Sequence, residues 1–150
     1  MLKINLRILL FLIFFFQLPL TYGEEIFLSL KKNKVNVRYG PGLDFPIKYI
    51  YRKINLPIKQ IDKKENWRRI IDIKNNSGWI HWSQLKKINS VITLKEKKLF
   101  KKPSLFSKPI AKIKKGRLLV VQKCDNNWCK IKSEKFKGWI KVDNIWGSIN

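Results

Sequence analysis

Two cysteines and one histidine are the residues of this 150-residue sequence best suited to act as nucleophiles or metal ligands. The cysteines lie close together, in the segment Cys124-Asp125-Asn126-Asn127-Trp128-Cys129. Asn126 and Asn127 predict the two-residue turn of a β-hairpin, because asparagine tolerates the positive φ that such turns need. Cys124 would then lie directly opposite Cys129, about 4.5 Å away at Cα in a non-hydrogen-bonded pair, at the short end of disulfide geometry. We predict a disulfide in an oxidising compartment, with a free reactive pair as the alternative.

A disulfide would leave little catalytic chemistry in the sequence. A Cys–His nucleophilic pair needs a free thiol beside His81 and a third group to orient it. Two bridged cysteines and a single histidine also make a poor zinc site. No pair of carboxylates stands in a recognisable acid/base setting. We therefore expect a protein that is not an enzyme and holds no metal or cofactor, with His81 as a partly exposed residue at the end of a strand.

The tryptophans point instead to binding or packing. Side chains alternate between the two faces of a strand, so residues an odd number apart point in opposite directions. Trp67 lies three residues before Ile70, and Trp79 lies next to Ile80. If the isoleucines fill a core, both tryptophans face outward, and a hairpin between their strands would place them on one outer surface.

Two uses of these outer tryptophans remain open. They pack against loops or against another part of the chain, or they form a stacking platform for a peptide or a sugar. Trp82 and Trp146 would add to the outer surface.

The same small unit occurs twice in the chain. Trp67-Arg68-Arg69-Ile70 recurs as Trp128-Cys129-Lys130-Ile131, and Gly78-Trp79-Ile80 recurs as Gly138-Trp139-Ile140. We therefore place one repeat at residues 27–87 and a second, degenerate repeat at residues 93–149.

Each repeat is expected to contain about five short strands, because runs rich in β-formers alternate with Gly, Asn and Pro turns. The expected strands are 34–38, 47–51, 57–62, 67–72 and 77–81 in the first repeat, and 98–101, 110–114, 118–123, 128–132 and 137–141 in the second. No stretch after Gly23 shows a convincing helical period. The fold class is therefore all-β, with two tandem small barrels.

The first 23 residues have the pattern of a secretory signal peptide. Lys3 and Arg7 precede the apolar run Ile8–Phe16, and Thr21-Tyr22-Gly23 offers small residues before a cut at Glu24. The apolar run is shorter than the roughly 20 residues that span a bilayer, so an uncleaved anchor is the lesser alternative. We expect an exported protein, periplasmic in location, whose mature chain has no transmembrane segment.

Positive charge dominates the composition, with 33 Lys+Arg against 10 Asp+Glu and a net charge of +23. Loss of the leader would leave +21, because Lys3 and Arg7 leave with it. Part of this excess is typical of AT-rich coding, which also gives 27 Lys, 21 Ile and a single Ala. The charge predicts attraction to anionic surfaces. Nucleic acid is not an expected partner of an exported protein.

One glycine-rich segment occurs in the first repeat only. Gly40-Pro41-Gly42 follows Asn36-Val37-Arg38, whereas the second repeat has Leu99-Phe100-Lys101-Lys102 there. A tight bend between strands is the favoured interpretation. A phosphate-binding loop would require a following helix and a Lys-Ser/Thr pair, and both are lacking.

Val35-Asn36-Val37-Arg38-x-Gly40-Pro41-Gly42, with Trp67 and Gly78-Trp79-Ile80, resembles the bacterial SH3-like (SH3b) domain. The second repeat keeps only the half that contains Trp128 and Gly138-Trp139-Ile140. With its leader, the chain is similar to two-repeat exported SH3-like proteins of alphaproteobacteria. The resemblance implies small β-barrels and a binding role in the cell envelope, often towards peptidoglycan or peptides.

We accordingly predict a ligand site in the first repeat for a cell-wall peptide or peptidoglycan. Flat apolar contacts and a cation for a ligand carboxylate would come from Asn36, Arg38, Tyr39, Phe45, Trp67 and Trp79. The alternative is a structural or protein–protein adaptor that binds an envelope protein. In that case the aromatic residues are used between the repeats, and only charge holds the protein to anionic polymers.

Overall fold

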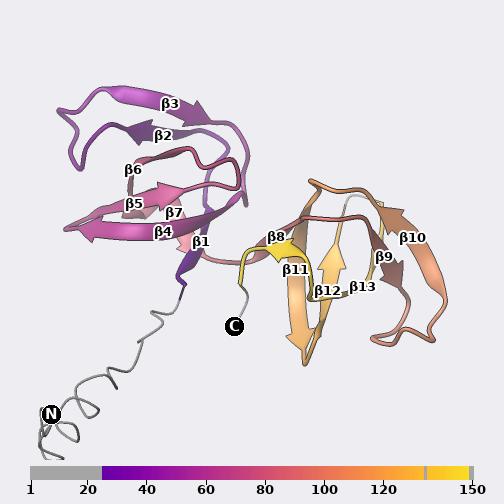
Figure 1. Cartoon of the computed structure of the whole chain (residues 1–150). Coiled ribbons are helices and arrows are strands. Elements are labelled where there is room, and N and C mark those ends of the chain that lie inside the picture. Colours follow the sequence, from indigo (N-terminus) through magenta and orange to yellow (C-terminus); the bar gives the residue numbers. More distant parts are fainter. Residues whose placement is uncertain (1–24, 134, 149–150) are drawn as a thin grey trace, which may run out of the picture.

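The computed structural model describes residues 25–133 and 135–148, and the predicted leader at residues 1–23 lies outside this range. The described residues form two antiparallel sheets, one per repeat, that lie side by side (Figure 1). They contain no α-helix, only the 3-10 turn η1 (Trp82–Gln84). The expectation of an all-β chain with two tandem small barrels is confirmed. No helix in the described part of the chain is long and apolar enough to cross a membrane.

The first sheet has seven strands in the spatial order β3-β2-β6-β5-β4-β1-β7. Five of them fall on the segments expected from the sequence, and β1 and β7 are additional. The strands are β1 (Phe27–Leu30), β2 (Val35–Arg38), β3 (Ile47–Tyr51), β4 (Pro57–Lys64), β5 (Trp67–Ile71), β6 (Ser77–His81) and β7 (Leu85–Lys87).

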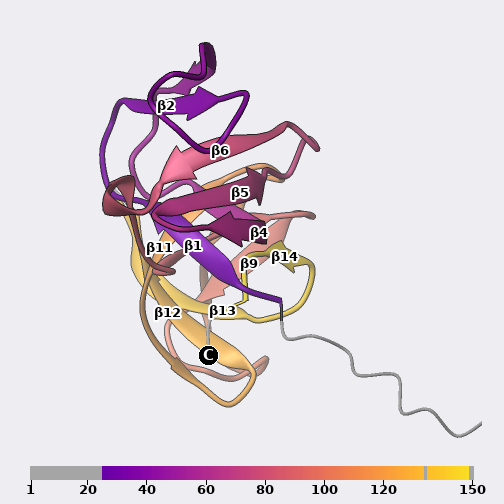
Figure 2. The ribbon, with the colours of Figure 1, turned by 90° about the vertical axis from the view of Figure 1, so that its left-hand side faces the viewer.

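The second sheet repeats this arrangement, in the order β10-β9-β13-β12-β11-β8-β14. Here β8 and β14 are the additional strands. The strands are β8 (Ser90–Thr93), β9 (Lys97–Phe100), β10 (Pro109–Ile113), β11 (Leu118–Asp125), β12 (Trp128–Lys132), β13 (Lys137–Lys141) and β14 (Ile145–Trp146). Figure 2 shows the two curled sheets from the side.

Aliphatic side chains from alternate strand positions fill each barrel, as the sequence predicted for the isoleucines. Ile70 and Ile80 are fully buried in the first core, and Ile131 and Ile140 are fully buried in the second. Equivalent bulges interrupt β4 between Gln60 and Asp62 and β11 between Val121 and Lys123. A bulge increases the local twist and bends its strand, so these irregularities help each short sheet curl around its core.

The turn between β5 and β6 is built around the carboxylate of Asp72. Its oxygens accept hydrogen bonds from the backbone N–H groups of Lys74 and Asn76, from the Asn76 side-chain amide and from the Tyr51 hydroxyl, over 2.8–3.0 Å. Burial acts to raise the pKa of Asp72, but the hydrogen bonds from Asn76, Tyr51 and Lys74 outweigh it and hold the pKa below its usual value. The carboxylate therefore fixes the end of the hairpin that carries Trp67, Trp79 and His81.

A small polar and aromatic interface joins the two repeats. The hydroxyls of Ser29 and Ser90, both fully buried, lie 3.0 Å apart, and Ser90 also donates to the carbonyl of Asn55. Trp146 packs edge-on against Phe27 with 5.2 Å between ring centroids, and its Nε1–H donates to the carbonyl of Pro57 at 3.3 Å. Trp146 is half-buried and packs against the other repeat, which is one of the two uses left open for the outer tryptophans.

The predicted disulfide between Cys124 and Cys129 is present. The two residues are direct partners across the β11–β12 hairpin, with Cα atoms 4.1 Å apart, and Asp125 pairs with Trp128 beyond them. Asn126 adopts φ 50°, the left-handed conformation expected for the turn. The equivalent pair in the first repeat is Lys63 with Arg68.

Candidate functional site

A groove of about 390 Å³ opens on the outer face of the first repeat. Its walls come from β2, the β2–β3 loop, the β4–β5 turn, β5, the end of β6 and η1. The lining residues are Asn36, Arg38, Leu43, Glu65, Asn66, Trp67, His81 and Gln84.

Strand register explains why three of these side chains meet. Trp67 of β5 pairs with His81 of β6, and Arg38 of β2 pairs with Trp79 two residues before His81. Continuing this antiparallel register brings Asn36 level with His81. Asn36, His81 and Trp67 therefore form a row across three neighbouring strands, on the face opposite the isoleucine core.

Trp67 forms the floor of the groove. Its ring lies edge-on to the His81 imidazole, with centroids 5.3 Å apart and planes at 78°. Only 9% of the residue is exposed, so it faces outward as predicted but is largely covered by its neighbours. His81 is held by its own turn, where Nδ1 lies 2.8 Å from the hydroxyl of Ser83.

Asn36 presents a hydrogen-bond acceptor that the protein leaves unused. Its Oδ1 atom is buried and has no hydrogen-bond partner in the structure. Buried polar atoms are paired in the great majority of cases, because an unpaired one costs about 1–3 kcal/mol. Asn55 and Asn89 also have a buried, unpaired Oδ1, but neither lines the groove.

Arg38 holds the β2–β3 loop against the groove. Its Nη1 donates to the backbone carbonyls of Leu43 and Phe45, at 3.1 Å and 2.6 Å. A guanidinium has five N–H donors, so this use of Nη1 leaves donors for a ligand. Glu65 stands on the β4–β5 turn, and the groove therefore combines a cation with a carboxylate.

The glycines of the β2–β3 loop make room for an aromatic ring. A Cβ at Gly40 would overlap the ring of Phe45, and a Cβ at Gly42 would come within 3.3 Å of it. Both glycines keep φ outside the left-handed region, so close approach is the reason for them and positive φ is not. The loop is a bend packed on Phe45.

The six predicted site residues divide into two groups. Asn36, Arg38 and Trp67 line the groove, whereas Tyr39, Phe45 and Trp79 do not. Tyr39 is 62% exposed, and the Lys48 ammonium lies 5.5 Å from its ring centroid. Trp79 is half-buried on the same outer face, where it pairs with Arg38 and Arg69.

Sequence reasoning did not place His81, Glu65 or Gln84 at the site. The signal for His81 was available, because it lies two residues after Trp79 and shares its face. Glu65 and Gln84 lie in a turn and at the end of η1, where alternation along a strand gives no information. Trp82, expected on the outer surface, is 54% exposed and lies beside His81 with 6.4 Å between ring centroids.

The second repeat has Phe100 at the strand position equivalent to Arg38. Phe100 pairs with Trp139 as Arg38 pairs with Trp79, and its ring packs edge-on against Trp128 with 5.5 Å between centroids. The Trp139 ring is covered by the ammonium groups of Lys123 and Lys130, at 5.6 Å and 5.8 Å from its centroid.

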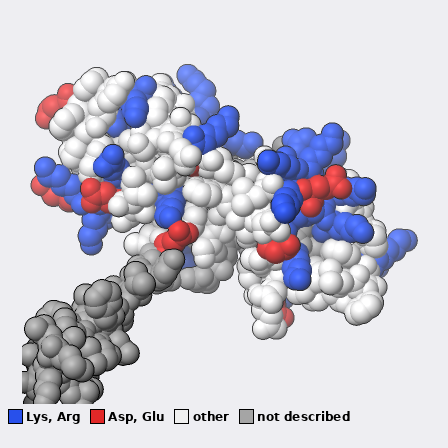
Figure 3. Space-filling view, in the orientation of Figure 1, with Lys and Arg blue, Asp and Glu red and all other residues white. Residues whose placement is uncertain are grey.

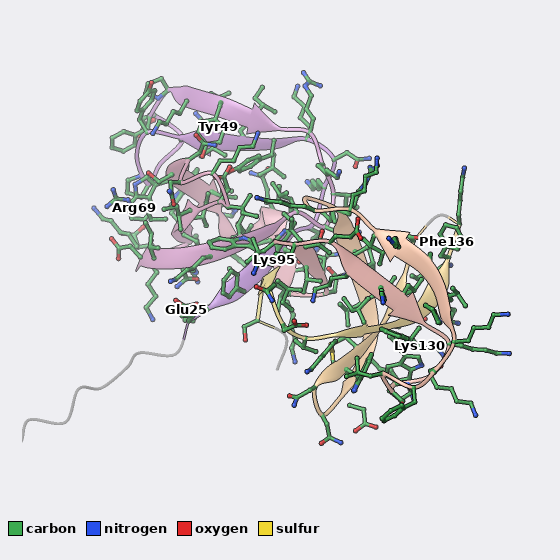
Figure 4. All side chains as sticks on the ribbon, turned by 45° about the vertical axis from the view of Figure 1, so that its right-hand side comes forward. Glu25, Tyr49, Arg69, Lys95, Lys130 and Phe136 are labelled. Atoms are coloured by element: carbon green, nitrogen blue, oxygen red, sulfur yellow. A yellow bond between two sulfur atoms is a disulfide. The ribbon has the colours of Figure 1, made fainter. Side chains whose placement is uncertain are left out.

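Charge is spread over the molecule without forming one block. Figure 3 shows Lys and Arg side chains scattered across both repeats, with a few acidic groups between them. Figure 4 labels Arg69 on the first repeat and Lys130 on the second, at opposite ends of the molecule. The groove is therefore one local feature on a broadly basic surface.

The sequence matches the model of the bacterial SH3 domain over residues 31–87 and again over residues 95–147. No curated protein matches the sequence. Two solved structures, NlpC2 and NlpC1 from Trichomonas vaginalis, are similar at 15% and 14% identity, each with a TM-score of 0.38. The alignments cover 85% of this chain but only 50% and 48% of those chains, so this chain spans about half their length. The two family matches cover most of the described residues, and the chain belongs to the bacterial SH3 domain family, with two domains in tandem.

Proposed function

We propose that the protein is an exported, non-enzymatic binding module whose first repeat binds peptide or peptidoglycan in the cell envelope. The observation that carries this proposal is the groove beside Trp67, which is lined by Asn36, a residue whose Oδ1 is buried and unpaired. A peptide N–H or an ammonium group would give this acceptor the partner that it lacks.

The charges of the groove fit the same class of ligand. Arg38 can pair with a carboxylate, and Glu65 can accept from an amine. Cell-wall stem peptides carry both groups, together with small apolar side chains that could lie on the floor formed by Trp67. A neutral sugar chain would use neither charge.

An extracytoplasmic location is supported by two observations. The leader pattern at residues 1–23 is typical of export, and the Cys124–Cys129 disulfide is typical of an oxidising compartment. For a protein of this kind we propose the periplasm. The general positive charge would hold it near anionic envelope polymers.

The adaptor alternative has support from Trp146. This tryptophan is used between the repeats, as that alternative requires, whereas Trp67 lies on the opposite face of its strand from the core and lines the groove. An adaptor would bind a protein partner and leave soluble muropeptides unbound, so titration separates the two functions.

The test is a titration with soluble muropeptides released from purified sacculi, followed by calorimetry and by tryptophan emission. We expect saturable binding, a change in emission from Trp67, and about tenfold weaker binding for Asn36→Ala. Because the free protein gives Oδ1 of Asn36 no partner, this substitution removes no hydrogen bond of that atom and should not destabilise the fold. The matched control is Lys98→Ala, two residues before Phe100 as Asn36 is two residues before Arg38, which should bind like the wild type.

A second measurement separates a specific site from general charge. Purified sacculi are incubated with the protein at low and at high salt and then sedimented. A fitted groove retains the protein at high salt, whereas attraction by charge alone is screened. Complete release at high salt, together with no heat and no change in emission during the titration, would remove the binding function.

A further inference from the structure

We propose that the β9–β10 connection, residues 101–108, is a membrane-docking tip for the surface of an anionic phospholipid bilayer. We call this segment the tip loop. It joins β9 to β10 at the far end of the second repeat, away from the first repeat (Figure 1). The proposal is independent of the peptide groove, which lies in the other repeat.

Two adjacent apolar side chains project from the tip loop into solvent. Leu105 is 62% exposed, and Phe106 is 102% exposed, so its ring has essentially no packing contact with the rest of the protein. Single exposed apolar residues are common on protein surfaces. A neighbouring pair at the end of a loop, with one ring entirely uncovered, is the arrangement that lets side chains enter a bilayer interface.

Backbone N–H groups of the tip loop already have hydrogen-bond acceptors within the loop, as an apolar environment requires. The N–H of Lys101 donates to the carbonyl of Lys108, and the N–H of Lys102 donates to the hydroxyl of Ser107. Ser104 satisfies two further amides, since its hydroxyl accepts from Phe106 N–H at 3.2 Å and its carbonyl accepts from Ser107 N–H at 3.1 Å.

The N–H of Ser104 itself donates to the carbonyl of Lys102, and Pro103 has no N–H to satisfy. Unpaired amides are what make a loop costly to insert into lipid, because hydrocarbon offers them no partner. Most of the amides in the tip loop are therefore already paired within the loop.

Lysines flank the apolar pair on both sides. Lys101, Lys102 and Lys108 are all exposed, and the tip loop contains no acidic residue. Lysines beside an inserted apolar residue remain in the headgroup layer, where each contributes to attraction by anionic lipid. This combination of an apolar end and a basic rim selects a lipid surface over a purely polar polymer.

The corresponding loop of the first repeat lacks the lysines of the tip loop. Residues 39–46 also expose apolar side chains, but they include Asp44 and no lysine. Arg38 binds the backbone of this loop through two carbonyls, and the glycines of the loop pack on the Phe45 ring. One loop therefore borders a groove, while the other ends in free apolar side chains.

The test is co-sedimentation with vesicles of phosphatidylcholine alone and of phosphatidylcholine with about 30% phosphatidylglycerol. The protein is purified after export, and its mass is checked so that every variant carries the same N-terminal residues. We expect the wild type to bind the anionic vesicles and bind neutral vesicles weakly. Leu105→Ser/Phe106→Ser should bind the anionic vesicles at least about tenfold more weakly.

Two control variants distinguish binding through the tip loop from binding through other exposed apolar residues and from attraction by charge. Ile54→Ser/Ile61→Ser removes two exposed isoleucines of the first repeat and should leave vesicle binding unchanged. Lys101→Gln/Lys102→Gln/Lys108→Gln should weaken binding to anionic vesicles and reduce its dependence on salt. Leu105 and Phe106 are exposed, so their replacement should leave the far-UV spectrum and the unfolding midpoint as in the wild type.

Three results would overturn the proposal. They are no binding of the wild type to anionic vesicles, equal binding of the Leu105→Ser/Phe106→Ser variant, and equal binding to both kinds of vesicle. If the variant bound vesicles equally and also lost its binding to sacculi, this second result would in addition assign the tip loop to the cell wall. Muropeptide binding should be the same in the variant and the wild type, so failure of this proposal leaves the groove untouched.

Discussion

The ring of Phe100 packs edge-on against Trp128 in the second repeat, at the position where the first repeat has Arg38 beside Trp67. A single difference in residue type at an equivalent strand position therefore gives the two tryptophans different neighbours. The aromatic ring packs on Trp128, which stays half-buried. Arg38 holds the β2–β3 loop through the carbonyls of Leu43 and Phe45, and it lines the groove beside Trp67.

Phe100→Leu should cost about 1–2 kcal/mol of stability without affecting muropeptide binding, because it removes an aromatic pair and leaves the first repeat intact. Arg38→Lys should show the reverse, with a small loss of stability and several-fold weaker binding, because a lysine lacks the further N–H donors that the guanidinium keeps for a ligand while Nη1 holds the loop. Urea unfolding and calorimetric titration measure the two effects. Weaker muropeptide binding in Phe100→Leu than in Arg38→Lys would contradict this division.

Trp146→Ala should uncouple the two repeats. The substitution removes both the packing on Phe27 and the hydrogen bond to the carbonyl of Pro57, and we expect a loss of about 2 kcal/mol. Calorimetry should then resolve two unfolding transitions in place of one. Trp82→Ala is the control, since Trp82 is mostly exposed. A single transition at an unchanged temperature in Trp146→Ala would show that the interface contributes no coupling.

The strands that the sequence predicted are those with a visible alternation. The segments around Trp67 and Trp128 each run for five residues with a buried isoleucine, and the structure places strands there. The strands not expected, β1, β7, β8 and β14, are two to four residues long. All four residues of β8 are buried, because the strand lies close to the junction of the repeats. It therefore lacks the alternation of buried and exposed residues by which a strand is recognised in a sequence.

The sequence predicts which face of the strands carries the candidate site, but it does not predict the groove on that face. Alternation places Asn36 and Trp67 outside the core, and the hairpin brings Trp67 and Trp79 to one surface. Which loops fold over that surface depends on single contacts, such as Arg38 with the carbonyl of Phe45. Residue types alone do not show such contacts. Trp146 illustrates the same limit, since its partners are more than 80 residues away in the chain.

Removing the disulfide should lower the stability of the second repeat. The bond closes a very short loop, so the chain-entropy contribution to stability is about 2 kcal/mol. We expect Cys124→Ser/Cys129→Ser to lower the urea midpoint by a corresponding amount and to leave muropeptide binding unchanged. Reduction of the wild type should give the same midpoint. A variant as stable as the oxidised wild type would mean that the hairpin turn at Asn126 alone maintains the pairing.

Gly40→Ala should disturb the β2–β3 loop more than Gly42→Ala. A methyl group at Gly40 would overlap the ring of Phe45, which must then move, whereas one at Gly42 would meet the ring at 3.3 Å. Since Arg38 holds this loop at Leu43 and Phe45, the displaced ring should weaken muropeptide binding several-fold in Gly40→Ala. Calorimetric titration of both variants compares them directly. Equal affinities would show that the loop does not shape the groove.

Asp72→Asn should lower stability at neutral pH and flatten its dependence on acid. Burial acts to raise the pKa of Asp72, but hydrogen bonds from Asn76, Tyr51 and Lys74 stabilise the carboxylate and outweigh it. The pKa in the folded protein therefore lies below the value of about 3.9 expected in the unfolded chain. Its contribution is therefore complete above about pH 4 and is lost as the pH falls through the folded value. We expect the amide to cost about 2 kcal/mol at pH 7.

Urea unfolding from pH 7 down to pH 2 should show the wild type and Asp72→Asn converging as the carboxylate takes up a proton. Asp62→Asn is the matched control, because Asp62 is exposed and its side chain accepts only from the neighbouring N–H of Lys63. If the gap between wild type and Asp72→Asn stayed constant across this range, the substitution would act through packing in the turn. The hydrogen-bonded carboxylate would then not be what positions the hairpin that carries Trp67 and His81.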